Sequence, residues 1–180
     1  MSGKKGWISN ARKSYWKISQ SWISRNCFTQ ADAIITARLV RDTDTESIAF
    51  GDPVVLNGDN SYSKFGEDGT ADAFVGVAVR EVKQSTDYFS EQVSYKPGQP
   101  CDVLERGSIT VLCNVGTPTA GGAVYLRIKA NASIPKGIVS GFEAEADREN
   151  TIKLPGVKWK TGKLDTNKVA EITILSRNNP

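Results

Sequence analysis

Two acidic clusters are the parts of this sequence whose residue types and spacing could bind a metal ion. Asp42, Asp44 and Glu46 lie at alternate positions, as the first ligands of a calcium-binding loop do. Such a loop needs Gly at its sixth position and Glu at its twelfth, where this chain has Ser47 and Pro53. The pattern therefore predicts a solvated turn and no calcium site.

The second cluster alternates acidic residues over a short segment near the C-terminal third of the chain. Its members are Glu143, Glu145, Asp147 and Glu149. Chelation of a cation is one interpretation, but Arg148 lies among the carboxylates and no glycine provides a ligand loop. We predict an exposed polar patch, built as a loop or a helical turn, and no metal.

The sequence predicts no catalytic activity and no cofactor. Histidine is absent, which removes Ser-His-Asp and Cys-His catalysis and makes a catalytic zinc site improbable. No motif singles out a Lys-Ser pair, and neither a Walker loop nor a G-x-G-x-x-G pattern occurs.

The cysteines predict buried, reduced thiols. Cys27, Cys101 and Cys113 are odd in number and contain no C-x-x-C spacing. Disulfides are rare in reducing compartments, although Cys101 and Cys113 would approach each other if Arg106-Gly107 formed a hairpin turn.

The clearest binding feature is a basic, aromatic N-terminal arm, residues 1–31. It carries six basic side chains and no acidic one, whereas residues 32–180 carry 17 basic and 20 acidic side chains, a net charge of −3. Tryptophan, tyrosine and arginine dominate binding hot spots, so we expect the arm to dock on a partner. The candidate contact residues are Trp7, Arg12, Lys13, Tyr15, Trp16, Lys17, Trp22 and Arg25.

Two alternatives for the arm stay open. Its tryptophans could instead cover the end of the body's own core. The same charge and rings also suit single-stranded nucleic acid, although the acidic body would repel phosphate. Direct contact with nucleic acid is therefore not expected.

The elements behind the arm are short strands separated by Gly and Pro turns, with almost no helical periodicity. This pattern predicts an all-β fold, a small antiparallel sandwich or barrel, in a single domain over residues 32–180 with the arm extended from it. The expected strands are 34–41, 51–56, 74–80, 100–105, 108–115, 123–129, 137–141, 156–160 and 168–175, with a long polar loop at 57–72.

Two patterns predict how these strands pack. The small residues Gly76 and Ala78 share one face of their strand, which predicts close approach of another layer or a tightly curved sheet. In the last strand Ile172 and Ile174 are expected to face inward. No apolar run approaches the roughly 18 residues needed to span a bilayer, and no secretory signal is visible, so synthesis in a cytoplasm is expected.

The central block of the chain resembles bacteriophage structural cement, or head decoration, proteins. The resemblance is carried by FVGVAVREVKQ (74–84), YKPGQPCDVLERGSITV (95–111) and AGGAVYLRI (120–128), and it covers residues 33–175. It implies a mostly β, β-tulip-like fold with no enzymatic role.

The resemblance also implies a function and partners. Such proteins coat the outer surface of the mature phage head, bind the major capsid protein and bridge adjacent capsomers, which stabilises the virion capsid against the pressure of its DNA. They commonly self-associate as homotrimers and sometimes as dimers. A nucleic-acid-binding β-barrel and a structural component of the tail or baseplate are the alternative functions.

Overall fold

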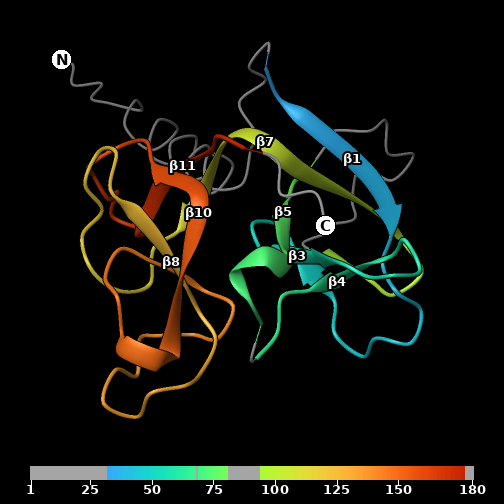
Figure 1. Ribbon diagram of the computed structural model, residues 1–180, viewed down its shortest axis with the longest axis horizontal. Coiled ribbons are helices and arrows are strands. Elements are labelled where there is room, and N and C mark those ends of the chain that lie inside the picture. Colours follow the sequence, from blue (N-terminus) through green and yellow to red (C-terminus); the bar gives the residue numbers. More distant parts are fainter. Residues whose placement is uncertain (1–31, 68, 81–93, 177–180) are drawn as a thin grey trace, which may run out of the picture.

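The computed structural model describes residues 32–67, 69–80 and 94–176 of the chain, and this part is almost entirely β-structure (Figure 1). Two 3-10 turns, η1 (Ala71–Ala73) and η2 (Arg148–Asn150), interrupt it. The strands are β1 (Ile34–Leu39), β2 (Ile48–Ala49), β3 (Pro53–Leu56), β4 (Tyr62–Lys64), β5 (Phe74–Ala78), β6 (Ser94–Tyr95), β7 (Pro100–Leu112), β8 (Ala123–Arg127), β9 (Phe142–Glu143), β10 (Thr151–Trp159) and β11 (Val169–Ile174). No helix in these residues is long and apolar enough to cross a membrane.

The C-terminal half of β7 belongs to a closed five-stranded barrel. Its strands pair antiparallel in the order β7, β11, β10, β8 and β9. A parallel bridge between Cys113 and Phe142 joins the last strand to the end of the first and closes the circle. We call this unit the C-terminal barrel.

The N-terminal half of β7 belongs to a second ring, which lies beside the C-terminal barrel (Figure 1). Here β7 pairs with β1 on one edge and with β5 on the other, and β3 and β4 continue from β5. A parallel bridge between Val40 and Tyr62 brings the two ends of this N-terminal ring together. The predicted antiparallel β-fold is confirmed, and the barrel is the form it takes.

Each ring has its own apolar interior. The larger cluster fills the C-terminal barrel around Trp159, Leu126 and Ile109 and extends to β5 and the N-terminal half of β7. The smaller one fills the N-terminal ring around Tyr62, Val54 and Val103. Strand alternation explains this division, because successive side chains of a strand point to opposite faces. The predicted inward orientation of Ile172 and Ile174 is confirmed, since their exposed fractions are 0% and 2%.

Gly76 lies where two paired strands of one sheet come very close, and its close neighbour is thus a strand of the same sheet and not another layer. A side-chain carbon at this position would fall against the carbonyl oxygen of Leu104 and only 2.8 Å from a methyl group of Val103. All five residues of β5 are buried. The absence of a side chain at residue 76 therefore allows β5 to lie against β7.

The turn predicted at Arg106-Gly107 is wrong. Residues 100–112 form one continuous strand, in which Gly107 has a φ of +124° and lies against Ala33. Glycine tolerates this backbone conformation without ending the strand. Cys101 and Cys113 consequently lie at opposite ends of β7, and the hairpin that would have brought them together does not form.

Two smaller expectations also change. The segment predicted as a polar loop contains β4, because Asn60 adopts a positive φ and turns the chain back so that β4 pairs with β3. The weak strand predicted at 137–141 is instead part of a loop, and β9 begins one residue later, at Phe142.

Candidate functional site

The predicted contact residues of the arm lie outside the described residues. These are Trp7, Arg12, Lys13, Tyr15, Trp16, Lys17, Trp22 and Arg25. They remain a prediction, and the site analysis concerns the body of the protein.

Neither acidic cluster forms a metal site in the described part of the chain, where no group of three or more potential ligands comes together. Asp42 and Glu46 lie exposed in a turn between β1 and β2. Glu145 and Glu149 are exposed as well. The other two members of the second cluster, Glu143 and Asp147, have a different environment.

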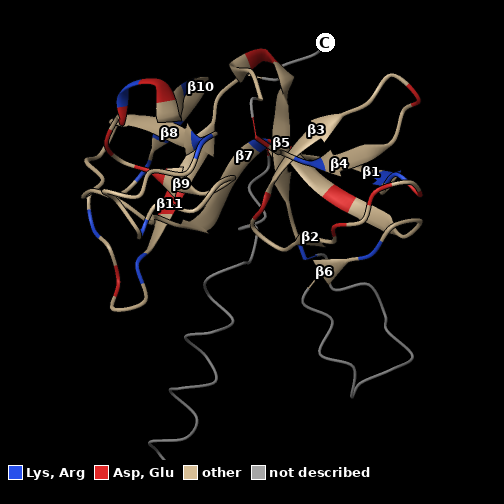
Figure 2. Ribbon diagram, turned by 90° about the horizontal axis from the view of Figure 1, so that it is seen from below, with Lys and Arg blue, Asp and Glu red and all other residues tan. Residues whose placement is uncertain are grey.

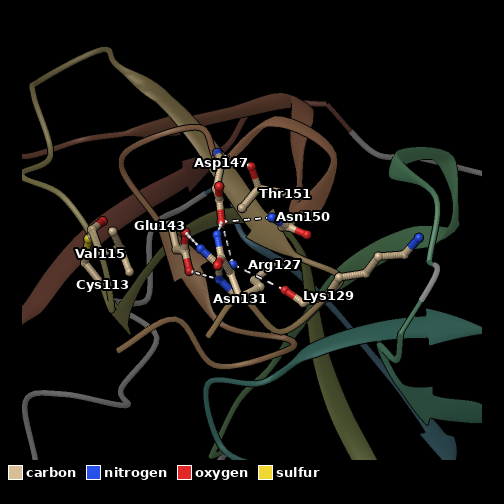
Figure 3. A network of polar contacts seen from close by, with 9 residues as sticks. All are labelled: Cys113, Val115, Arg127, Lys129, Asn131, Glu143, Asp147, Asn150 and Thr151. Atoms are coloured by element: carbon tan, nitrogen blue, oxygen red, sulfur yellow. Dashed lines mark hydrogen bonds and ion pairs between the residues drawn. The ribbon is translucent and has the colours of Figure 1, made fainter. Parts of the chain in front are cut away.

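Arg127, the last residue of β8, binds both of these carboxylates on the strand face opposite the barrel core (Figure 3). Its Nε and Nη2 donate to the two oxygens of Glu143 at 2.5 and 2.9 Å, and its Nη1 donates to Asp147 at 2.9 Å. The side chains of Arg127 and Glu143 are fully buried, while that of Asp147 is 14% exposed. Such a two-point contact fixes the relative orientation of both groups.

The network also holds the loop that joins β8 to β9, residues 128–141. Arg127 donates from Nη1 to the carbonyl oxygen of Lys129 at 3.2 Å, and Asn131 donates to Asp147 at 2.9 Å. Asn150 donates to the same carboxylate at 3.2 Å. The 128–141 loop, β9 and η2 are thus connected, directly or through Asp147, to the buried side chain of Arg127.

The prediction of an exposed polar patch is therefore wrong for Glu143. It lies on β9 opposite Tyr125 of β8, and Arg127 compensates its charge in the interior. Sequence reasoning missed Arg127 because a basic residue in an alternating strand ordinarily faces solvent. The only signal was the group of carboxylates that follows it by 16 to 22 residues.

Three buried side chains, Cys101, Cys113 and Tyr62, have pKa values raised far above neutral pH. Burial raises the pKa of Cys101 to about 12 and that of Cys113 to about 11. Burial and the neighbouring Glu105 raise the pKa of Tyr62 to about 12. The two thiols lie in the cores of the rings, as predicted for reduced cysteines.

Two hollows flank the 128–141 loop. The larger, about 430 Å³, lies between the end of β7, residues 133–136 of the loop, and the β10–β11 connection at Leu164 and Lys168. The smaller, about 170 Å³, lies between the two rings and is lined by residues 138–142 of the chain and by Leu112. Figure 2 shows basic and acidic residues interspersed along the loops of the C-terminal barrel.

Comparison with known proteins identifies the family of the chain. The family model described as XM1 gp53 minor capsid protein matches residues 26–174, most of the chain. The chain belongs to the XM1 gp53 minor capsid protein family. It is accordingly a structural protein of a bacteriophage capsid and a component of the virion, associated with other capsid components. A search of the curated proteins gave no match.

A chain in a solved structure has a fold similar to that of this protein. A chain of "The capsid of Myoviridae Phage XM1" superposes with a TM-score of 0.61 and 13% sequence identity, over 86% of this chain and 90% of that chain. At this identity the likeness concerns the fold. The family match begins at residue 26, so the predicted arm contacts from Trp7 to Arg25 precede it.

Proposed function

We propose that this minor capsid protein is a decoration, or cement, protein. It binds the outer surface of the mature head through the major capsid protein and bridges adjacent capsomers, so that the shell resists the pressure of its DNA. The observation that carries the proposal is the family match over residues 26–174.

The body has properties that suit such a role. Its described residues are braced by a closed barrel and a buried ion-pair network, and they present no metal cluster. Among the described residues, four large apolar side chains are exposed: Leu39, Leu112, Ile138 and Leu175. Apolar surface of this kind is available for contacts with other proteins.

Self-association would strengthen modest contacts. A standard interface buries about 800 Å² on each partner. A homotrimer, or alternatively a dimer, offers several such contacts at once, and their linkage raises the overall affinity well above that of one contact. We therefore propose an oligomer that sits over a junction between capsomers.

The arm, residues 1–31, supplies the second attachment in this proposal. Its contact residues combine three tryptophans with a charge of +6, whereas residues 32–180 carry −3. The opposite charges favour docking of the arm on an acidic surface of the shell or of an adjacent copy. Burial of the tryptophans must offset the free-energy cost of ordering the arm.

The test is binding to heads assembled without this protein. Purified full-length protein is incubated with such heads, and the heads are imaged and sedimented. Discrete density over capsomer junctions is the expected result, and density on the tail or none at all would overturn the proposal.

A variant lacking residues 1–26 tests the arm separately. It should keep the melting temperature of the full-length protein and bind heads more weakly. Undiminished binding by this variant would rule out a docking arm. If the arm instead binds nucleic acid, its affinity for single strands should fall steeply between low and moderate salt.

A further inference from the structure

The larger hollow beside the 128–141 loop has the size and lining of a binding site. Its volume of about 430 Å³ falls within the range of about 300–1,000 Å³ that is usual for ligand pockets. Its walls are mainly apolar, formed by side chains such as Val115, Ile134 and Leu164. An apolar side chain of aliphatic or aromatic type would fit in this space.

The charged side chains that line the hollow are basic. Lys136 and Lys168 are the charged side chains among the described residues that line it, and both are exposed. Neither forms an ion pair within residues 32–67, 69–80 or 94–176. The lysines would repel the chain's own basic arm and attract carboxylates, because complementary charge selects partners at a rim.

The loop that forms one wall is held in place before any partner binds. Asn131 donates to Asp147 and accepts from the backbone N–H of Ser133 at 2.9 Å, and Asp147 is bound by the buried Arg127 (Figure 3). Successive turns join Ile134 to Asn131 and Gly137 to Ile134 through backbone hydrogen bonds of 2.9 Å. A site that is already ordered avoids the entropic cost of ordering on binding.

The same loop carries the most exposed large apolar residue of the described chain. Ile138 is 62% exposed and lines the second hollow together with Leu112, which is 48% exposed. The loop is therefore an apolar ridge between two hollows, with lysines on one side. Apolar centres with a charged rim are the usual anatomy of protein interfaces.

We propose that this ridge and the lysine-rimmed hollow form a preformed docking surface for a capsid protein segment in which a large apolar side chain adjoins aspartate or glutamate. The apolar side chain enters the hollow, and the carboxylates bind Lys136 and Lys168. The inference rests on the proposed function and gives that function a contact surface on the body, separate from the arm.

The first experiment uses heads assembled without this protein. The double variant Lys136→Glu/Lys168→Glu should bind them more weakly than the wild type, by about tenfold or more at about 0.15 M salt. A matched control is Lys96→Glu/Lys153→Glu, which makes the same charge change at exposed residues that line neither hollow. The control should bind within about twofold of the wild type.

The second experiment needs no heads and separates the two proposals. Anilinonaphthalene sulfonate joins an apolar ring system to one negative charge, so the isolated protein should bind it in the hollow and enhance its fluorescence. The Lys136→Glu/Lys168→Glu variant should lose most of this enhancement at an unchanged melting temperature, and the control variant should retain it.

The outcomes are distinct. If wild type and both variants bind heads equally, the docking surface is wrong and the proposed function stands. If the wild type does not bind heads, the proposed function is wrong, and the dye alone tests the hollow. Equal dye binding by both double variants would overturn the hollow as a site.

Discussion

Replacing Arg127 by methionine should destabilise the protein severely. The substitution leaves the carboxylate of Glu143 without its partner in a position that solvent does not reach. It also removes one hydrogen bond from Asp147 and one from the carbonyl oxygen of Lys129. Removing one member of a buried ion pair typically costs about 3–5 kcal/mol. That is a large fraction of the roughly 5–15 kcal/mol by which domains are stable.

The assay is unfolding in urea, followed by tryptophan fluorescence, together with thermal melting. For a chain of this size, a loss of about 3–5 kcal/mol lowers the melting temperature by roughly 6–20 °C. The matched control is Lys160→Met, which breaks the ion pair between Lys160 and Glu171 at 2.8 Å, where the lysine is 40% exposed. A surface pair of this kind contributes only about 0–1 kcal/mol.

A double variant keeps the test informative if Arg127→Met alone does not fold. In Arg127→Met/Glu143→Leu the stranded charge is removed, so the double variant should recover about 2 kcal/mol or more relative to the single one. The reasoning is refuted if Arg127→Met costs no more than Lys160→Met. It is also refuted if removal of the carboxylate restores nothing.

Three further outcomes are expected. Gly76→Ala should lower the free energy of unfolding in urea by about 1–3 kcal/mol, because the new methyl group meets the β7 backbone. The control Gly58→Ala has open space around it and should be nearly neutral. Equal effects of the two substitutions would contradict the close approach. Burial raises the pKa values of Cys101 and Cys113. In a Cys27→Ser variant these two thiols should therefore react with a disulfide reagent at pH 8 only after unfolding. Rapid reaction of the folded protein would show that they are accessible. Hydrogen bonds from Asn131 and Arg127 hold the pKa of Asp147 below its ordinary value of 3.8 in the folded protein. The stability that the Asp147 carboxylate contributes is therefore present above pH 3.8, and it is lost as the pH falls through the lower pKa of the folded state. Asp147→Asn should therefore unfold with a weaker pH dependence below pH 4 than the wild type, and an unchanged acid limb would exclude this contribution.

Much of the fold is predictable because apolar and polar residues alternate regularly in several of its strands. Alternation in residues 123–129 and 168–175 identifies β8 and β11 and their inward faces. The small side chains at Gly76 and Ala78 indicate a close approach for a steric reason that acts locally. These features depend on neighbours in the sequence.

The errors concern features that depend on distant residues. Gly107 permits a turn and also permits the unusual φ of a continuous strand, and only the packing of Ala33 against it selects the strand. Glu143 is a surface residue by type and becomes buried because Arg127 faces it across the β8–β9 pairing. The hollow beside Lys136 and Lys168 brings together residues 113–116, 133–136 and 164–168, which no local pattern links.

The sharing of β7 by both rings governs the order in which the chain can fold. Its pairs join residues far apart in sequence, such as Ile34 with Arg106 and Gly107 with Ile174. Neither ring can close until β7 is in place, so each ring requires contacts with large loop-closure entropy. Folding should accordingly be slow, in the range of about milliseconds to seconds that is typical of all-β topologies, and the two rings should fold and unfold in one cooperative step. During synthesis, a growing chain that has not yet reached β7 can complete neither ring. The C-terminal barrel is completed last, when β11 has left the ribosome.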